Sequence, residues 1–225
     1  MLKRMIAPVL FGLIGASILV SLGLWQSQRL VWKQGIIAEI NAKIAKNPVA
    51  LPQNPTEAKD EYLAVKLNGA ALPGEIHVLT SHQIFGPGYR LITRFQTGDR
   101  VILVDRGFVQ QKSIDLARPQ LKGEIIGNLL WPNELDPTFT PKPDLAANIW
   151  FARDLPAMAK FLKAEPILVV LRSNPGGVAK VLPWPVTSSG IPNNHLEYAV
   201  TWFLMALAWL GMTAYWVWRI RRQLD

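Results

Sequence analysis

Two long uncharged stretches, one near each end of the chain, dominate its pattern of hydrophobic and polar positions. Residues 5–24 and 198–218 contain no Asp, Glu, Lys or Arg, and the second stretch also lacks proline. An α-helix rises about 1.5 Å per residue, so about 20 apolar residues cross a hydrocarbon core about 30 Å thick. Each stretch is therefore predicted to form a transmembrane helix.

The first stretch has a second interpretation, a cleaved signal peptide, because Ser21 and Gly23 have the spacing of a cleavage site. A signal peptide usually has an apolar run of about 7–15 residues, which is shorter than this stretch. Trp25 and Gln26 would also make an unusual start for a mature chain. An uncleaved helix is the favoured interpretation.

Basic residues predict the orientation of the second stretch. Arg219, Arg221 and Arg222 follow it, whereas no Lys or Arg lies between Val181 and His195 on its other side. The positive-inside rule places the C-terminus in the cytoplasm. With a span at each end of the chain, both termini are expected to be cytoplasmic and the region between the spans exported.

The hydrophobic period changes from helical to strand-like between the two spans. Helical spacing of apolar residues continues to Asn47, and Pro48, Pro52 and Pro55 then predict an extended linker. Beyond the linker, runs rich in Val, Ile, Leu and Tyr are separated by Gly-containing turns, which is typical of short strands. The predicted strands cover residues 62–72, 75–84, 89–96, 100–109, 123–131 and 167–171, with a last one over 178–181.

The remaining segments complete the predicted domain. A proline-rich loop is expected over 132–143, and Asp154 is expected to cap a helix that runs through Lys163. Closely spaced strands predict a mainly antiparallel sheet curled towards a barrel, with this helix packed against it. The connections are too short for parallel βαβ units.

The predicted fold class is thus a membrane protein with two transmembrane α-helices that flank an exported α+β domain. Residues 1–25 form a cytoplasmic tail and the first transmembrane helix, and 26–60 a helical extension and linker. Residues 61–192 form the exported domain, 193–218 the second transmembrane helix, and 219–225 a cytoplasmic tail.

Charge and composition exclude several functions. The chain of 225 residues carries a formal net charge of +8, but half of this excess belongs to residues that flank the two spans. The other half is spread along 30–194 without a basic run, unlike the stripe of a nucleic-acid-binding protein, so no nucleic-acid partner is expected. The absence of cysteine excludes disulfides, thiolate metal sites and cysteine nucleophiles.

The start of the second span carries the candidate chemistry. Asn194 and Glu197 have the spacing of a capping box, which would make His195 the first helical residue. The positive end of the helix dipole disfavours an imidazolium there, and a neutral imidazole can bind a metal. Tyr198 and Trp202 follow on the same helical face. An interfacial histidine within an aromatic belt explains the same residues, since one histidine alone makes no metal site.

Six stretches resemble, in order, the motifs of one family over nearly the whole chain. They are LGLWQSQR (22–29), GPGYRLITRF (86–95), VILVDRGFV (101–109), IWFARDLPAMA (149–159), AEPILV (164–169) and NNHLEYAVTWF (193–203). Each motif alone is weak, but six in the right order between two predicted spans are specific. The chain thereby resembles the surfeit-locus-one (Shy-one-like) assembly factors of cytochrome c oxidase.

The resemblance implies a helper protein and not an enzyme. Such a protein binds haem A as transient cargo and assists its insertion into subunit I of cytochrome c oxidase. The implied partners are oxidase subunit I, membrane lipid and, as a further candidate, haem A synthase. The implied location is the bacterial inner (plasma) membrane, which makes the exported domain periplasmic.

The resemblance also implies a haem site at the start of the second span, where the family histidine corresponds to His195. His195 is expected to be an axial ligand of the haem iron. Tyr198 and Trp202 are expected to line the site, with lipid around the isoprenoid tail of the haem. His77 and His82 fall in no recognised motif, so the second axial ligand is undefined.

Four other polar residues have two interpretations each. The fork of Arg106, beside Asp105, suits contact with haem propionates, but these two residues also suit a pair inside the domain that fixes a strand end. Gln26 and Arg29 lie where the first span meets the domain. Snorkelling and helix orientation explain them as well as ligand binding does.

Two further functions are open. A haem-independent scaffold would stabilise partly assembled subunit I by helix packing, and Gly12 and Ala16 form a small-xxx-small pair that allows a second helix to approach closely. A membrane-bound hydrolase would need a nucleophile–base pair or a metal constellation. No HExxH, GxSxG or clustered His/Asp set occurs in the sequence, which disfavours the hydrolase.

Overall fold

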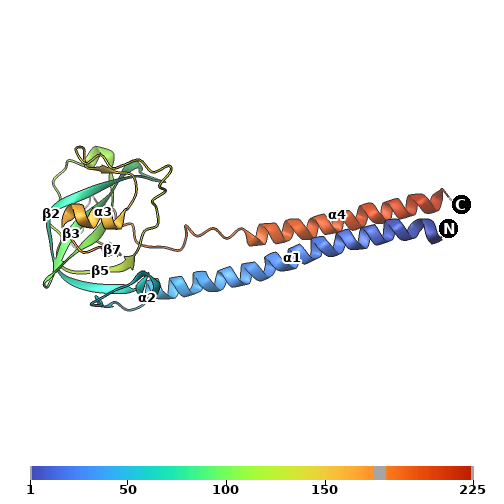
Figure 1. The fold of residues 1–225 in the computed structure, drawn as a ribbon, viewed down its shortest axis with the longest axis horizontal. Coiled ribbons are helices and arrows are strands. Elements are labelled where there is room, and N and C mark those ends of the chain that lie inside the picture. Colours follow the sequence, from blue (N-terminus) through green and yellow to red (C-terminus); the bar gives the residue numbers. More distant parts are fainter. Residues whose placement is uncertain (1, 175–180, 224–225) are drawn as a thin grey trace. The chain divides into compact units, whose positions relative to one another are not determined.

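The computed structural model describes residues 2–174 and 181–223, which fall into two compact units. One unit joins Met1–Glu39 to Ser188–Asp225 and contains helix α4 (His195–Arg222) and most of helix α1 (Leu2–Ala45). The other unit, Ile40–Thr187, contains the strands (Figure 1).

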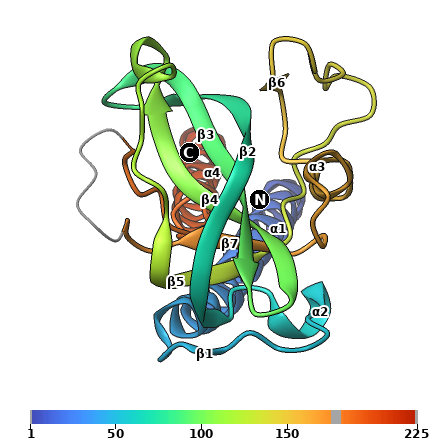
Figure 2. The same cartoon turned by 90° about the vertical axis from the view of Figure 1, so that its left-hand side faces the viewer.

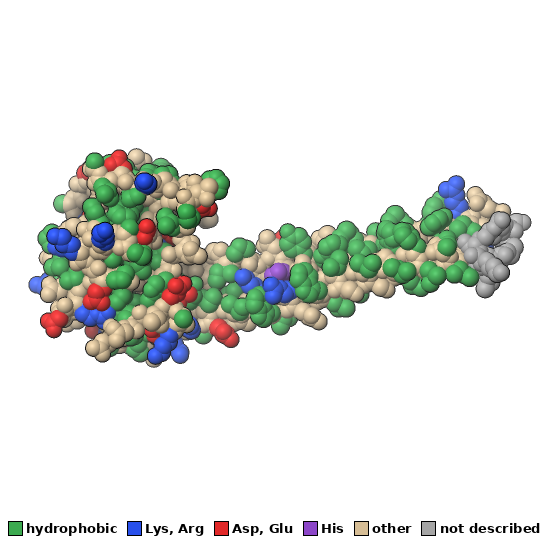
Figure 3. Space-filling model, in the orientation of Figure 1, with side chains coloured by type: hydrophobic (Ala, Val, Ile, Leu, Met, Phe, Trp, Pro, Cys, Tyr) green, Lys and Arg blue, Asp and Glu red, His purple; other side chains and the backbone are tan. Residues whose placement is uncertain are grey.

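The helix unit contains two helices that are long and apolar enough to cross a membrane. Helix α1 continues without a break beyond the first uncharged stretch, as its helical spacing predicts. Many large apolar side chains on the two helices are exposed, for example Phe11 at 58% and Leu207 at 68%. In Figure 3 such side chains line the visible face of both helices. This surface is compatible with a membrane protein.

Small residues of α1 face large residues of α4. A Cβ atom on Gly12 would lie 2.2 Å from Cγ2 of Thr213, and one on Gly15 would lie 2.4 Å from Nε1 of Trp209. The indole N–H of Trp209 donates to the backbone oxygen of Gly12 at 3.1 Å, and its ring lies 5.2 Å from that of Phe11. Glycine at these positions therefore lets side chains of α4 reach the backbone of α1.

Five strands of the second unit close into a barrel. In spatial order they are β2 (Ala64–His82), β3 (Gly86–Thr97), β4 (Arg100–Gln110), β7 (Leu168–Leu171) and β5 (Lys122–Leu130). Strand β5 pairs back with β2 and completes the circle (Figure 2). Neighbouring strands are antiparallel except β4 and β7, which are parallel. The prediction of a curled, mainly antiparallel sheet is confirmed.

Several short elements lie outside the five-stranded barrel. Strands β1 (Val49–Ala50) and β6 (Ile149–Trp150) each add a parallel pairing of two residues to β2. The parallel pair β4–β7 is not a simple βαβ unit, because β5 and helix α3 (Leu155–Leu162) lie between its strands in the sequence. The unit also contains helix α2 (Glu57–Asp60) and a 3-10 turn (Gln111–Ser113).

Strand β2 corrects one prediction. The sequence suggested two strands, 62–72 and 75–84, separated by Pro73-Gly74, but β2 runs through this dipeptide. Pairing with β3 shifts register between Ala71 and Glu75. The residues between Ala71 and Glu75 have no partner in β3, so no ladder hydrogen bond is needed there. This stretch therefore accommodates Pro73, which has no N–H, and Gly74, which has φ of +106°. The predicted strand over 178–181 lies largely outside the described residues.

Helix α3 forms as predicted. Asp154 lies at its N-cap, and its side chain accepts a hydrogen bond from the backbone N–H of Ala157 at 3.1 Å. Lys163 ends the helix in the left-handed conformation. The buried face of α3 packs into one of the apolar clusters of the barrel unit through Leu155, Met158, Ala159 and Leu162.

A buried carboxylate organises the polar interior of the barrel unit. Asp105 is fully buried, and its Oδ2 accepts hydrogen bonds from Arg90 Nε at 2.8 Å and Arg153 Nη1 at 3.3 Å. Its Oδ1 accepts from the backbone N–H of Gly107 at 2.9 Å. The predicted pairing of Asp105 with Arg106 is therefore wrong, because successive side chains of a strand leave it on opposite faces.

Removing the charge of Asp105 tests this arrangement. Asp105→Asn keeps an oxygen for Gly107 but leaves the guanidinium groups of Arg90 and Arg153 without a shared carboxylate. Breaking a buried ion pair costs about 3 kcal/mol or more because a buried charge remains uncompensated. We expect a clearly lower thermal unfolding midpoint by circular dichroism. Asp99→Asn, at an exposed turn residue, is the matched control, and equal midpoints for the two variants would contradict the prediction.

The pH dependence of stability gives a second test. Burial alone would raise the pKa of Glu134, but hydrogen bonds from Arg153 and its charge outweigh burial, so the pKa lies below its ordinary value. A carboxylate with a lowered pKa in the folded state stabilises the protein above its unfolded pKa. This contribution disappears as pH falls through the folded pKa.

Unfolding midpoints measured from neutral pH down to about pH 3, below the ordinary glutamate pKa of about 4.3, should therefore fall less steeply in Glu134→Gln than in the parent. Glu124→Gln is the control, because Glu124 is 59% exposed and lies 3.6 Å from Lys66. The control should retain the parent slope. Identical slopes in all three proteins would refute the assignment.

Candidate functional site

Helix α4 begins at His195, as predicted, but its cap differs from the prediction. Asn194 occupies the N-cap position, and its backbone oxygen accepts from the N–H of Tyr198 at 3.2 Å. Its side chain makes no capping hydrogen bond. A capping side chain reaches the first turn from an extended backbone, whereas Asn194 has φ of −94° and ψ of 13°. The predicted capping box is therefore not formed.

His195 has one hydrogen-bond partner, which comes from the other helix of the same unit. Its Nδ1 lies 2.8 Å from Oε1 of Gln26 on α1. An amide oxygen only accepts hydrogen bonds, so Nδ1 donates in this contact, and in a neutral ring the free lone pair would then lie on Nε2. Within the described part of the chain, no other residue bonds to this ring. The half-buried imidazole is thus oriented with one nitrogen available to a metal.

The aromatic residues expected beside His195 lie on the same helix. Tyr198 is 55% exposed, and Trp202 is partly buried. No ring contact or hydrogen bond joins either side chain to His195 among residues 2–174 and 181–223. Both side chains share a helical face with the histidine, and the exposed Tyr198 ring is accessible to a ligand.

An apolar groove lies further along the helix pair. Its volume is about 450 Å³, and almost all of its lining is apolar. Its walls combine a glycine on α1 with flexible methionines on α4, a composition that adapts to an irregular apolar guest. The lining residues are Gly15, Ile18, Leu19, Met205, Ala208, Trp209 and Met212.

His195 is not part of an all-protein metal cage. Nowhere in the described part of the chain do three or more His, Asp or Glu side chains gather to hold a metal ion. Haem iron needs only one or two protein ligands, because the macrocycle supplies the other donors. A single oriented imidazole therefore fits a haem iron better than a free metal ion.

The other two histidines belong to the barrel unit. Nε2 of His77 lies 2.8 Å from Oε1 of Glu75, and Nδ1 of His82 accepts from the backbone N–H of Ile84 at 3.2 Å. The ring of His82 also packs 5.2 Å from that of Trp184. Both imidazoles are engaged within their own unit, and a second axial ligand stays undefined.

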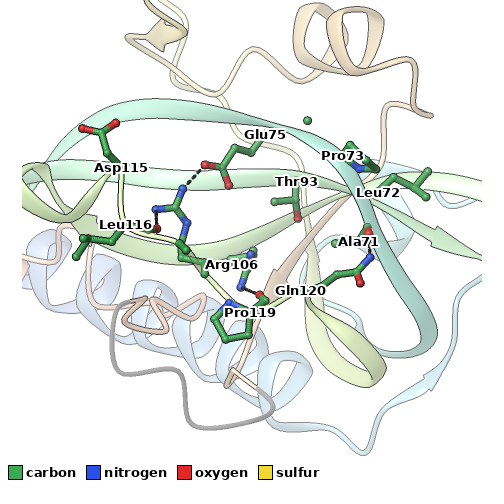
Figure 4. Close-up of a pocket in the computed structure, with 13 residues that line it drawn as sticks. Ala71, Leu72, Pro73, Glu75, Thr93, Arg106, Asp115, Leu116, Pro119 and Gln120 are labelled. Atoms are coloured by element: carbon green, nitrogen blue, oxygen red, sulfur yellow. Dashed lines mark hydrogen bonds and ion pairs between the residues drawn. The ribbon is translucent and has the colours of Figure 1, made fainter.

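Arg106 lies in the barrel unit, not in the helix unit that contains His195. It lines an open pocket of about 510 Å³ on the barrel, together with Glu75 and Thr93 (Figure 4). It is 6% exposed, and its Nη2 donates to the backbone oxygen of Pro119 at 3.2 Å. Burial lowers the pKa of this guanidinium, and the charge of Glu75 only partly opposes the effect.

Glu75 is already committed inside that pocket. Its Oε1 accepts hydrogen bonds from Arg118 and from His77. Burial by itself would raise the pKa of Glu75, but the hydrogen bond from His77 and the charge of Arg118 outweigh it and lower the pKa. The carboxylate therefore stays ionised and is paired with Arg118, not with Arg106.

The sequence named Gln26 as a candidate but did not predict its contact with His195. From the sequence, helix orientation and ligand binding explained Gln26 equally well. The contact with His195 joins two residues that are 169 positions apart in the sequence, so it depends on the register of the two helices. The available signal was positional, because Gln26 and His195 lie at the exported ends of the two predicted spans, within the first and last of the six motifs.

Comparison with known proteins identifies the family. Residues 13–207 match the SURF1 family. The SURF1-like protein of Drosophila melanogaster is 32% identical over 92% of this chain and 76% of its own length. Surfeit locus protein 1 of Homo sapiens is 32% identical over 83% of this chain and 70% of its own length. The SURF1-like protein of Rickettsia felis is 32% identical over 87% of this chain and 90% of its own. The chain therefore belongs to the SURF1 family, as its six motifs predicted.

Proposed function

We propose that this protein is a cytochrome c oxidase assembly factor that binds haem A beside His195 and assists its insertion into oxidase subunit I. The SURF1 family is known for cytochrome c oxidase assembly and is a family of assembly factors, not of enzymes. One observation supports the haem step above all others. The His195–Gln26 hydrogen bond is made through Nδ1, which leaves Nε2 on the other side of the ring for a bond to iron.

In this proposal Gln26 positions the ligand. A metal-binding histidine usually donates its other ring N–H to a carbonyl or carboxylate, which fixes its tautomer and its orientation. The amide oxygen of Gln26 meets this requirement at 2.8 Å from Nδ1. Haem A would supply an iron that accepts a nitrogen lone pair, and Tyr198 and Trp202 would line its macrocycle.

The apolar groove offers room for the isoprenoid tail of haem A. Its α4 residues, Met205 to Met212, follow His195 by 10–17 positions, or about 15–26 Å along the helix. A tail lying along α4 would bury apolar surface against methionine and tryptophan, and membrane lipid would cover its other side. His195 and the groove would then hold the two chemically different ends of one cargo molecule.

We further propose a bacterial inner-membrane location, with both termini cytoplasmic and the barrel unit periplasmic. Three arginines in the last turn of α4 agree with a cytoplasmic C-terminus. In this arrangement haem A synthase would supply the cargo and oxidase subunit I would receive it. Two helices of sufficient length and a bacterial SURF1-like relative support the membrane location.

A haem-independent scaffold for subunit I is the second candidate, because α4 has many exposed apolar side chains. One observation weakens it. The small residues expected to receive a partner helix, Gly12 among them, already face Thr213 and Trp209 of the same chain. A colourless complex of full-length protein and subunit I, isolated from cells that make haem A, would favour the scaffold.

Replacement of His195 tests the haem proposal. Full-length protein purified from cells that make haem A should show haem absorbance and yield haem A on extraction. His195→Ala should lose both but still enter the membrane, since the apolar helix does not depend on this residue. The control is His77→Ala, which removes a histidine of the barrel unit and should retain pigment. Unchanged haem content in His195→Ala would refute His195 as the ligand.

Replacement of Gln26 tests its positioning role. Gln26→Leu should weaken haem affinity about 10–100-fold, the usual effect of removing the partner of a metal-binding histidine. Gln26→Glu should retain haem and shift its midpoint potential to more negative values, because a carboxylate partner makes the imidazole a stronger donor. Gln28→Leu, at an exposed position of the same helix, should match the parent in both measurements. A potential unaffected by Gln26→Glu would contradict the role.

A further inference from the structure

The pocket beside Arg106 has the features of a binding site in the barrel unit. It has a volume of about 510 Å³, within the range of about 300–1,000 Å³ common for ligand sites. In Figure 4, side chains from β2, β3 and β4 meet there with the segment that precedes β5. The residues that matter for its chemistry are Leu72, Glu75, Thr93, Arg106, Asp115, Leu116 and Arg118.

A β-bulge fixes Arg106 at this pocket. The pairing of β3 with β4 passes from Arg90↔Phe108 to Ile92↔Asp105, so Arg106 and Gly107 together oppose a single residue of β3. Gly107 has φ of +111°, and a Cβ atom there would lie 2.1 Å from a backbone oxygen. Bulges of this kind redirect a side chain and recur beside functional sites. The bulge therefore requires glycine after Arg106 and determines the direction of the arginine side chain.

Arg106 is a buried cation that forms no ion pair with a carboxylate of the described residues. Its only hydrogen bond in the described part of the chain goes to a backbone oxygen, and its buried Nε has none. None of the ion pairs among the described residues includes it, because Glu75 is paired with Arg118. A buried charge without a partner is costly, so an anion in this pocket would relieve a penalty that the protein otherwise carries.

The surroundings select the kind of anion. A guanidinium fork matches a planar carboxylate, and the carboxylates of Glu75 and Asp115, which also line the pocket, disfavour a doubly charged ligand. The hydroxyl of Thr93 makes only a 3.5 Å hydrogen bond to Val104, so it can turn towards a ligand. Leu116, which is 45% exposed, and Leu72 supply apolar walls. We propose that this pocket binds a ligand carboxylate, with Arg106 as its charge partner and the leucines against its apolar body.

The proposal does not rest on haem ligation by His195. A short fatty acid, an acidic protein side chain and a porphyrin propionate all carry the same group. The first test uses full-length protein in lipid nanodiscs and sodium butyrate as the probe, titrated by calorimetry at constant ionic strength. Butyramide is the uncharged probe of equal size and should bind at least about tenfold more weakly, because hydrogen bonds to a charged group are the strong ones.

Arg106→Met should weaken butyrate binding at least about tenfold. Arg94→Met is the matched control, because Arg94 also has a buried Nε without a hydrogen-bond partner among the described residues but does not line the pocket. It should bind butyrate like the parent. Equal binding of butyrate and butyramide to the parent, or undiminished butyrate binding to Arg106→Met, would overturn the proposal.

Charge substitutions at the exposed Leu116 give a test that does not disturb the barrel interior. Leu116→Lys should strengthen butyrate binding and Leu116→Glu should weaken it, each about two- to fivefold, as for an exposed charge beside a bound ion. If Arg106→Met does not fold, the two Leu116 variants alone test whether the pocket binds butyrate. Identical affinities in the two Leu116 variants would then overturn the proposal.

Further probes identify the source of the carboxylate. N-acetyl-glutamic acid amide represents an acidic side chain, and metal-free protoporphyrin IX represents a propionate, with its dimethyl ester as the uncharged control. The porphyrin contains no iron, so His195 cannot ligate it and the result is independent of the haem proposal. The probe with the largest Arg106-dependent affinity names the ligand class, and the absence of Arg106-dependent binding by every probe would refute the site.

Discussion

Close packing of α1 against α4 is the constraint on which the His195 site depends. The contacts follow an antiparallel register, in which Gly12 meets Thr213, Gly15 meets Trp209 and Gly23 meets Phe203. A side chain on any of these glycines would push the helices apart. The same register leads Gln26 towards the start of α4, where it meets His195. Helix packing between α1 and α4 thus places Gln26 where it orients the imidazole at the start of α4.

The sequence predicted most of the fold because its local signals are strong. Uncharged runs of spanning length, an Asp154 cap and strand-length apolar runs each depend on neighbours in the chain. Two of the failed predictions in the barrel unit share one cause, which is strand pairing. Pro73-Gly74 predicts a strand end on local grounds, but β2 accommodates it because a register shift against β3 removes the need for a ladder bond. The partners of Asp105, Arg90 and Arg153, likewise depend on strand pairing that the sequence does not contain.

The same division applies to the candidate sites. The position of His195 at the start of a helix could be predicted from local pattern, but its partnership with Gln26 could not, because it depends on the register of two distant helices. Arg106 was recognised as a candidate anion-binding residue from its type and motif. That it forms no ion pair among the described residues became visible only when Glu75 proved to be paired with Arg118. Local signals indicate which residues are candidates, and tertiary structure determines their partners.

In the function proposed above, an amide in place of a carboxylate beside His195 would suit a protein that must release its cargo. A carboxylate partner raises the basicity of a metal-binding imidazole and strengthens its bond to the metal. The neutral oxygen of Gln26 orients the ring at 2.8 Å but adds no negative charge to it. Gln26 would thus fix the direction of the imidazole without making it a stronger ligand for iron. In the proposed role of a transient carrier, this balance would favour transfer, because the receiving subunit would need only a better set of axial ligands.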